Sequence, residues 1–279
     1  MTIQPAVPLS GMAGLRYIDA TYDNQRAGFA NAGQMARDLD AFRTRVSGIR
    51  TAADLVADPP VLRVVLGAFG LEEEAPKRAF IRQIIESDPF DRESLAGRLV
   101  DPRFARLSET LGFFPGGRPR LDSPVLIERL AEDFVTRQFE KAVGAINEPL
   151  RLAMNFRREM GEIATRAASD TSGWLQALGR PPVRAVLQRA LGLPDGAMQL
   201  PLDRLTPLIA DRANAILGAE GLRALARPEA MERFVDRYLV QADASLARPG
   251  GAAPALQILS AGLGPNSAAG LFSILLSRP

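Results

Sequence analysis

The side chains in this sequence that could carry out chemistry are carboxylates, hydroxyls and guanidinium groups. The chain has no Cys and no His among its 279 residues. Without Cys there can be no disulfide, no thiolate nucleophile and no zinc site built on sulfur. Without His there can be no Ser-His-Asp triad, and nearly all zinc and non-haem iron sites are excluded. We therefore predict no catalytic, cofactor-binding or metal-binding residues.

Two groups of acidic residues are the first candidates for an exception. The run Glu72-Glu73-Glu74 could hold a hard cation, but it stands just before a predicted helix, where acids stabilise the positive end of the helix dipole. Asp88, Asp91 and Glu93 lack the ligand spacing, the turn glycine and the terminal bidentate Glu of an EF-hand loop. We interpret both groups as structural.

Two other segments look like known motifs. The segment 170–173, Asp-Thr-Ser-Gly, is similar to an aspartic-protease signature, but it carries an extra residue and occurs once. We interpret it as the cap of a helix that holds Trp174, which we expect in the core. Gly116 and Gly117 are not followed by Gly-Lys-Ser/Thr, so the sequence contains no phosphate-binding loop.

Helical periodicity dominates the sequence, for example in the apolar spacing of residues 61–69. Helix starts are marked by a capping side chain directly before a proline, as at Asp58, Asp101 and Ser123. Proline also stands near the start of other predicted helices, as in Glu148-Pro149. Helix ends are marked by glycines that can adopt the left-handed conformation, namely Gly70, Gly112 and Gly192.

No stretch shows sustained alternation of apolar and polar residues, so we predict no strands. The fold class that follows is all-α. The predicted helices span residues 12–29, 34–47, 51–57, 59–69, 75–87, 91–99, 102–111, 123–145, 149–168, 172–179, 181–191, 201–218 and 228–246.

An internal repeat relates two of these helices. Residues 58–71 (DPPVLRVVLGAFGL) align without gaps on residues 180–193 (RPPVRAVLQRALGL), and the identities include the helix start, the buried face and the final glycine. Two independent helices could converge on these letters, but we favour duplication. We predict a multi-helix array with two related helical units joined by a long central helix pair. The predicted domains are a first unit at 1–114, a linker and central helices at 115–170, a second unit at 171–247, and an apolar tail at 248–279.

Charge and hydropathy bear on the class of partner. The net charge is only +2, and the arginines are scattered among acids, so we predict no nucleic-acid binding. No window reaches eighteen uninterrupted apolar residues, so we predict no integral membrane segment. The amino terminus lacks the basic and apolar regions of a signal peptide, which makes classical secretion unexpected.

One stretch, from Phe134 to Arg158, is rich in basic residues interspersed with acids. We expect a solvated face there, with an anionic partner as the alternative. Its basic residues are Arg137, Lys141, Arg151, Arg157 and Arg158.

The segment 254–276 is apolar but interrupted by Gly264-Pro265. It could fold back to close the core, which we favour, or it could dock as an apolar helix in a groove on a partner. The residues that would make that docking contact are Leu256, Ile258, Leu259, Leu271, Phe272 and Leu275.

The order of several blocks also carries a family resemblance. The blocks ADLVADPPVLRVVLGAFGLEEE and LAGRLVDPRFARLSETLGF in the first half, followed by LRLAMNFRREMGEIA and WLQALGRPPVRAVLQRALGLP, resemble the alphaproteobacterial family known as domain of unknown function number 1217. Genes of that family are commonly found among flagellar genes. The family brings no catalytic residues to carry over.

The resemblance implies a biological setting more than an activity. We expect a non-enzymatic protein that helps to assemble or stabilise the bacterial flagellum by binding flagellar proteins, either in the cytoplasm or at the basal body. One alternative is an exported structural or accessory component of the flagellum. Another is a carboxylate-based enzyme or small-ligand binder in a cleft between the two units, which would require buried carboxylates that face each other.

Overall fold

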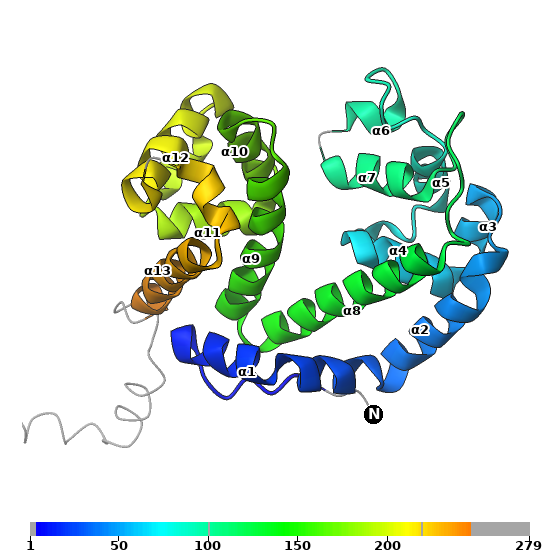
Figure 1. Cartoon of the computed structure of the whole chain (residues 1–279), viewed down its shortest axis with the longest axis horizontal. Helices are drawn as coiled ribbons and strands as arrows, with labels where there is room; N and C mark the ends of the chain where they lie inside the picture. The colour runs from blue at the N-terminus through cyan, green and yellow to red at the C-terminus, as the bar shows by residue number, and fades with distance from the viewer. Residues whose placement is uncertain (1–3, 100, 219, 247–279) are drawn as a thin grey trace, which may run out of the picture.

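Two long helices set the shape of the molecule. α8 (Pro124–Ile146) and α9 (Glu148–Arg166) form the arms of a V that meet at Asn147, and each arm carries a lobe of shorter helices (Figure 1). The computed structural model describes residues 4–99, 101–218 and 220–246, and this part of the chain contains helices and no strand. The prediction of an all-α fold is therefore confirmed.

The first lobe packs against α8. Its core contains Phe42, Val65 and Ile84, together with Phe134 from α8. Gly67 makes the close approach of α4 to α8 possible, because a Cβ atom there would lie 2.5 Å from the Phe134 ring. The helices of this lobe are α2 (Gly33–Arg45), η1 (Val46–Gly48), α3 (Ala52–Ala57), α4 (Pro59–Phe69), η2 (Glu72–Glu74), α5 (Arg78–Ile85), α6 (Leu95–Arg98) and α7 (Pro102–Leu111).

The second lobe packs against α9 and has a separate core. This core contains Trp174, Val186 and Phe234, and the ring of Phe234 stacks on Phe156 of α9 at 5.3 Å. The burial of Trp174, which is 1% exposed, confirms its predicted place in the core. The helices of this lobe are α10 (Asp170–Leu178), α11 (Pro181–Ala190), η3 (Asp195–Gln199), α12 (Leu202–Leu217), η4 (Gly221–Ala226) and α13 (Pro228–Leu246).

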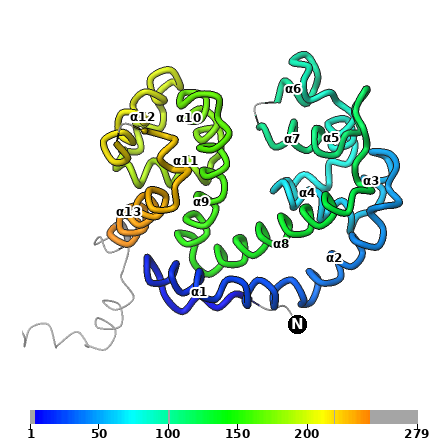
Figure 2. The backbone as a smooth tube through the Cα atoms, in the orientation of Figure 1, coloured from blue at the N-terminus to red at the C-terminus, as the bar shows by residue number. Residues whose placement is uncertain are grey.

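The first helix, α1 (Gly11–Ala30), connects the two lobes across the vertex of the V (Figure 2). Leu15 and Ile18 near its start are buried in the second core, whereas Ala30 at its end packs against the first core. The vertex is therefore supported by a third helix, in addition to the turn at Asn147.

Several helix boundaries follow from local capping. Asp58 accepts a hydrogen bond from the backbone N–H of Val61, and Asp101 accepts one from Arg103. Gly70 and Gly112 take left-handed conformations, with φ of 70° and 74°, as predicted. At Ser123 the predicted side-chain cap is wrong, because its hydroxyl makes no capping bond and the helix begins at Pro124 without it.

Three other boundaries depart from prediction. The cap of α9 is Asn147, whose side chain accepts from the N–H of Leu150, so this helix begins at Glu148. The predicted helix 91–99 shrinks to α6, because the side chains of Asp88 and Asp91 bond to nearby backbone N–H groups in turns that compete with a helix. The predicted helix 75–87 is shortened to Arg78–Ile85, and the acids that precede it form the 3-10 turn η2.

The two repeat segments occupy α4 and α11, and each of these helices contributes buried valines to the core of its own lobe. Their relationship by duplication stays a prediction. The turn at 115–119 lies within the first lobe, since Leu111 and Leu121 on either side of it share one core. The apolar tail, including Leu256, Ile258, Leu259, Leu271, Phe272 and Leu275, lies outside the described residues. In the described part of the chain, none of the helices combines the length and the apolar character needed to cross a membrane.

Candidate functional site

The centre of the molecule is a buried carboxylate surrounded by arginines. Glu159 of α9 accepts hydrogen bonds from Arg137 at 3.0 Å, from Arg158 at 2.5 Å and from Arg180. The side chains of Glu159 and Arg180 are 10% and 8% exposed. Three cations around one anion leave an excess of positive charge in this part of the interior.

A second carboxylate belongs to the same network. Glu140 of α8 is buried and accepts two hydrogen bonds from the guanidinium of Arg158, each at 2.8 Å. Arg158 therefore lies between Glu140 and Glu159, with a charge-assisted bond to each. Because Glu140 and Arg158 come from different arms of the V, this pair also fixes the arms relative to each other.

The arginines keep Glu159 ionised. Burial by itself raises the pKa of Glu159, but the charges of Arg158, Arg137 and Arg180 outweigh it and lower the pKa to about 2. The same contacts with Glu140 and Glu159 raise the pKa of Arg158, although burial acts against them. At neutral pH Glu159 is therefore ionised and holds no proton that it could donate.

Two further contacts join the lobes. Arg137 donates to the backbone carbonyl of Ala68 in α4 at 2.8 Å, so its guanidinium connects the first lobe to Glu159. Nearer the open end of the V, Arg106 of α7 forms an ion pair with Glu162 of α9 at 3.5 Å. Both partners in that pair are more than one-third exposed, so its contribution to stability is small.

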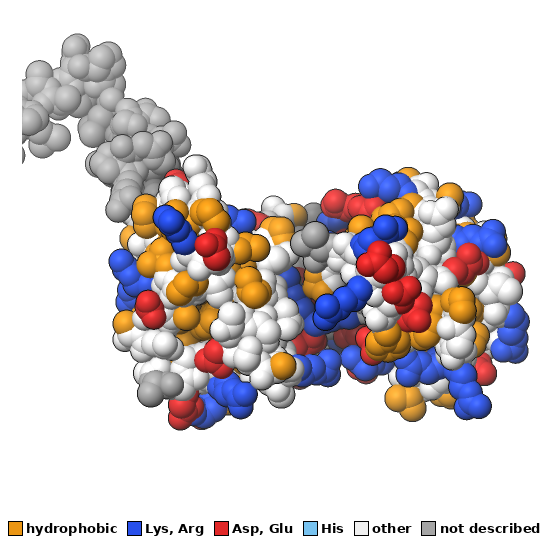
Figure 3. Space-filling model, turned by 90° about the horizontal axis from the view of Figure 1, so that it is seen from above, with side chains coloured by type: hydrophobic (Ala, Val, Ile, Leu, Met, Phe, Trp, Pro, Cys, Tyr) orange, Lys and Arg blue, Asp and Glu red, His pale blue; other side chains and the backbone are white. Residues whose placement is uncertain are grey.

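A hollow of about 480 Å³ lies above this network, between α7, α8 and α9. We call it the arginine cleft, because six arginines and three acidic residues line it. Figure 3 looks into the V from above and shows Lys and Arg side chains in the depression between the lobes. The arginines of the cleft are Arg106, Arg120, Arg129, Arg137, Arg158 and Arg166.

A second hollow, of about 570 Å³, lies on the vertex side of the network. Arg137 and Arg158 line both hollows, so the ion-pair network forms the wall between them. The charges in the second hollow are nearly balanced between Arg, Lys and Glu side chains. The buried Oδ1 atom of Asn155 lies at its edge and has no hydrogen-bond partner in the described part of the chain.

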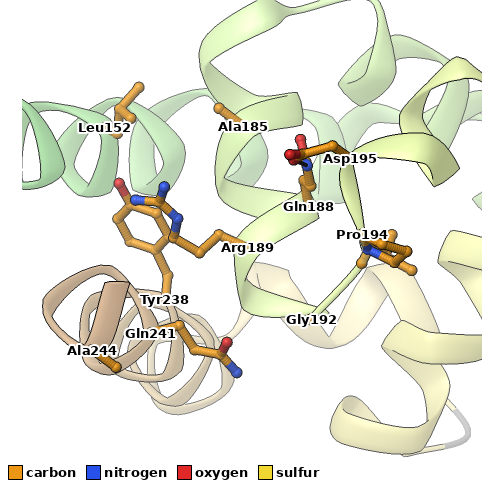
Figure 4. Close-up of a pocket in the computed structure, with 11 residues that line it drawn as sticks. Leu152, Ala185, Gln188, Arg189, Gly192, Pro194, Asp195, Tyr238, Gln241 and Ala244 are labelled. Atoms are coloured by element: carbon orange, nitrogen blue, oxygen red, sulfur yellow. Dashed lines mark hydrogen bonds between the residues drawn. The ribbon is translucent and has the colours of Figure 1, made fainter. Parts of the chain in front are cut away.

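A third hollow, of about 470 Å³, lies in the second lobe between α11 and α13 (Figure 4). It contains one acidic side chain, Asp195, which accepts a hydrogen bond from Gln188 at 2.7 Å. Tyr238 also lines this hollow, and burial raises the pKa of its phenol to about 12. A single carboxylate that accepts a hydrogen bond from a side-chain amide does not provide the pair of facing acids that carboxylate catalysis would need.

Two of the acidic candidates from the sequence, Glu72 and Glu74, have side-chain partners. Glu72 accepts from Gln138 and Lys141, and Glu74 accepts from Lys77. Among the described residues no group of three or more acidic side chains could hold a metal ion. The segment 170–173 does open α10, although the capping residue is Ser169, whose side chain bonds to the N–H of Ser172.

The prediction of a solvated basic face over 134–158 is wrong for three of its arginines, Arg137, Arg157 and Arg158. Arg137 and Arg158 are about one-fifth exposed, because the turn at Asn147 folds α9 back so that both side chains face the inside of the V. Arg157 is also about one-fifth exposed and pairs with Asp19 of α1 and Glu232 of α13. Only Lys141, at 57% exposed, fits the predicted solvated face well.

Glu140, Glu159 and Arg180 are not predicted from the sequence as parts of this network. One signal could have identified Glu159. It stands three residues after Phe156 and four before Ile163, which places it on the buried face of an amphipathic helix. A buried acid there must find a cationic partner.

Comparison with known proteins places the chain in a family. The sequence profile of the family described as "Protein of unknown function (DUF1217)" matches residues 68–239, which is more than half of the chain. The chain belongs to this family. No curated protein matches the chain.

A solved structure shares the fold. The X-ray crystal structure of a protein from Agrobacterium tumefaciens, determined in a structural genomics programme, superimposes with a TM-score of 0.70 at 21% sequence identity. The match covers 87% of this chain and 99% of the Agrobacterium chain. This chain and the Agrobacterium protein therefore share a fold. The comparison carries no information on activity.

Proposed function

We propose that this DUF1217 protein is a non-enzymatic scaffold that binds other proteins during assembly or stabilisation of the bacterial flagellum. In this proposal it acts in the cytoplasm or at the basal body and holds its partner between the two lobes. The flagellar setting rests on the resemblance of the sequence to a family commonly encoded among flagellar genes.

The observation that favours binding over catalysis is the bonding of the two buried carboxylates. Glu140 and Glu159 are both buried, as a carboxylate-based enzyme would need, but both are bonded to Arg158, and Glu159 to two further arginines. A carboxylate with a pKa of about 2 is a poor general base near neutral pH and cannot serve as a general acid. The pair is better suited to holding the arms of the V at a fixed angle.

Gene deletion in a motile bacterium that encodes the protein tests the proposal. We expect loss of swimming, with basal bodies that are absent or incomplete by electron microscopy, and restoration by the wild-type gene. Normal swimming with intact basal bodies would contradict the proposal. Fractionation separates the exported alternative, because an exported component would be present in sheared filaments or purified basal bodies.

A further inference from the structure

The arginine cleft carries more positive charge than its own acids neutralise. Asp133 and Glu162 are already paired with Arg129 and Arg106, at 3.8 and 3.5 Å. Arg120 donates only to the backbone carbonyls of Glu109 and Thr110, and Arg166 has no side-chain partner among the described residues. Within the described part of the chain these two guanidinium groups therefore lack a carboxylate partner.

The buried floor of the cleft does not remove this excess. Arg137 and Arg158 lie between the cleft and the buried acids Glu140 and Glu159, and Arg180 adds a third cation beside Glu159. The pKa of Arg137 is lowered by burial and then by Arg158, as expected where cations crowd together. An anion in the cleft would therefore be attracted by both the exposed and the buried arginines.

The rim of the cleft is apolar on one side. Val125, in the first turn of α8, is 81% exposed, and Leu126 and Phe69 are partly buried beside it. An isolated phosphate or a nucleic-acid backbone would leave these side chains uncovered. A polypeptide segment can cover them with its own apolar side chains while its carboxylates bond to the arginines.

We infer that the arginine cleft binds an acidic segment of a partner protein, with at least one apolar side chain of that segment placed against Val125 and Leu126. This inference rests on the proposed role as a protein-binding scaffold. Carboxylates of the segment pair with Arg120, Arg129 and Arg166 near the opening, where arginine can bind a carboxylate through two parallel hydrogen bonds. The arginines of the cleft repel basic segments, so they contribute to the choice of partner.

Photo-crosslinking in living cells tests the inference with the full chain. A photo-reactive amino acid replaces Val125 at the rim of the cleft, and a matched control replaces Val240 of α13, which is 53% exposed and lies outside the cleft. We expect the Val125 probe to crosslink a segment of another protein in which acidic residues outnumber basic ones. The crosslinked peptide is identified by mass spectrometry.

Charge reversal in the cleft provides a second test of the inference. The double variant Arg129→Glu/Arg166→Glu changes two exposed residues of the cleft, and we expect it to reduce the Val125 crosslink at least about tenfold. The control Arg16→Glu/Arg233→Glu makes the same change in net charge at exposed positions on α1 and α13 and should leave the crosslink unchanged. Thermal unfolding of both double variants verifies that neither change unfolds the protein.

Several outcomes would overturn the inference: no crosslink from Val125, a crosslink to nucleic acid or to this chain itself, a crosslink to a neutral or basic segment, or insensitivity to the Arg129 and Arg166 reversal. Failure here is distinguishable from failure of the proposed function. If gene deletion abolishes swimming and leaves incomplete basal bodies while the Val125 probe captures no acidic segment, the flagellar role holds and only the docking site is wrong.

Discussion

Arg137 on one arm of the V forms an ion pair with Glu159 on the other arm, at 3.0 Å, while its Nε atom donates to the carbonyl of Ala68 in the first lobe. This single side chain therefore links the two separately packed halves of the molecule. Because the pair is largely buried, removal of Glu159 leaves Arg137 in the interior without its carboxylate partner, which costs more than the loss of a surface pair.

The first prediction concerns the stability contributed by Glu159. We expect Glu159→Gln to lower the free energy of unfolding by about 3 to 5 kcal/mol, because three arginines lose their common anion. Glu162→Gln is the matched control on the same helix, and its half-exposed pair should contribute about 1 kcal/mol or less. Urea unfolding followed by circular dichroism measures both. Equal losses in the two variants would show that the buried network does not contribute more than a surface pair.

The second prediction concerns pH. The pKa of Glu159 is lowered from 4.5 to about 2 on folding. A carboxyl group whose pKa is lower in the folded state contributes stability above its unfolded pKa and loses it as the pH falls through the folded value. We therefore expect stability to decline between about pH 4.5 and 2 by an amount on the order of 3 kcal/mol from this group. Urea unfolding across that range should show the decline in wild type and a shallower one in Glu159→Gln; parallel curves would exclude the assignment.

The third prediction concerns the angle of the V. We expect Arg137→Met to leave both lobes folded but to widen the distribution of distances between them, because Arg137 bonds to Ala68 and Glu159 at once. The chain has no native Cys, so Glu109→Cys on α7 and Thr171→Cys on α10 provide unique sites for spin labels. Pulsed electron spin resonance then measures the distance across the cleft.

The control for that measurement is Arg129→Met, since Arg129 is 64% exposed and pairs only within its own helix. This variant should keep the wild-type distance distribution. If Arg137→Met also keeps it, the arms are fixed by α1 and the Asn147 turn alone.

The fourth prediction concerns the close packing of α4 on α8. We expect Gly67→Ala to lower the stability by about 1 to 3 kcal/mol, because the added methyl group would meet the buried Phe134 ring. Gly161→Ala on α9 adds the same methyl group where no atom lies within 4 Å, and it should raise the stability by up to about 1 kcal/mol. Thermal unfolding of the two variants should shift the midpoint in opposite directions; a stabilised Gly67→Ala would contradict the packing described here.

The sequence by itself determined the helices. The starts at Asp58 and Asp101 and the ends at Gly70 and Gly112 could be predicted because each signal acts over about four residues of the same chain segment. Where prediction failed, as at Asp88 and Asp91, another local hydrogen bond competed with the helix. The exclusion of His and Cys chemistry likewise required nothing beyond the residue types.

Only the tertiary structure decided which charges are buried and what they contact. Arg137 and Lys141 stand one helical turn apart, yet the first is 21% exposed and the second 57% exposed. The difference arises because α9 folds back at Asn147 and places Glu159, 22 residues away from Arg137, opposite the first side chain and not the second. Local sequence signals determine where a helix begins and ends. Whether a charged side chain is buried and which group it pairs with depend on the element that packs against it, and that element comes from elsewhere in the chain.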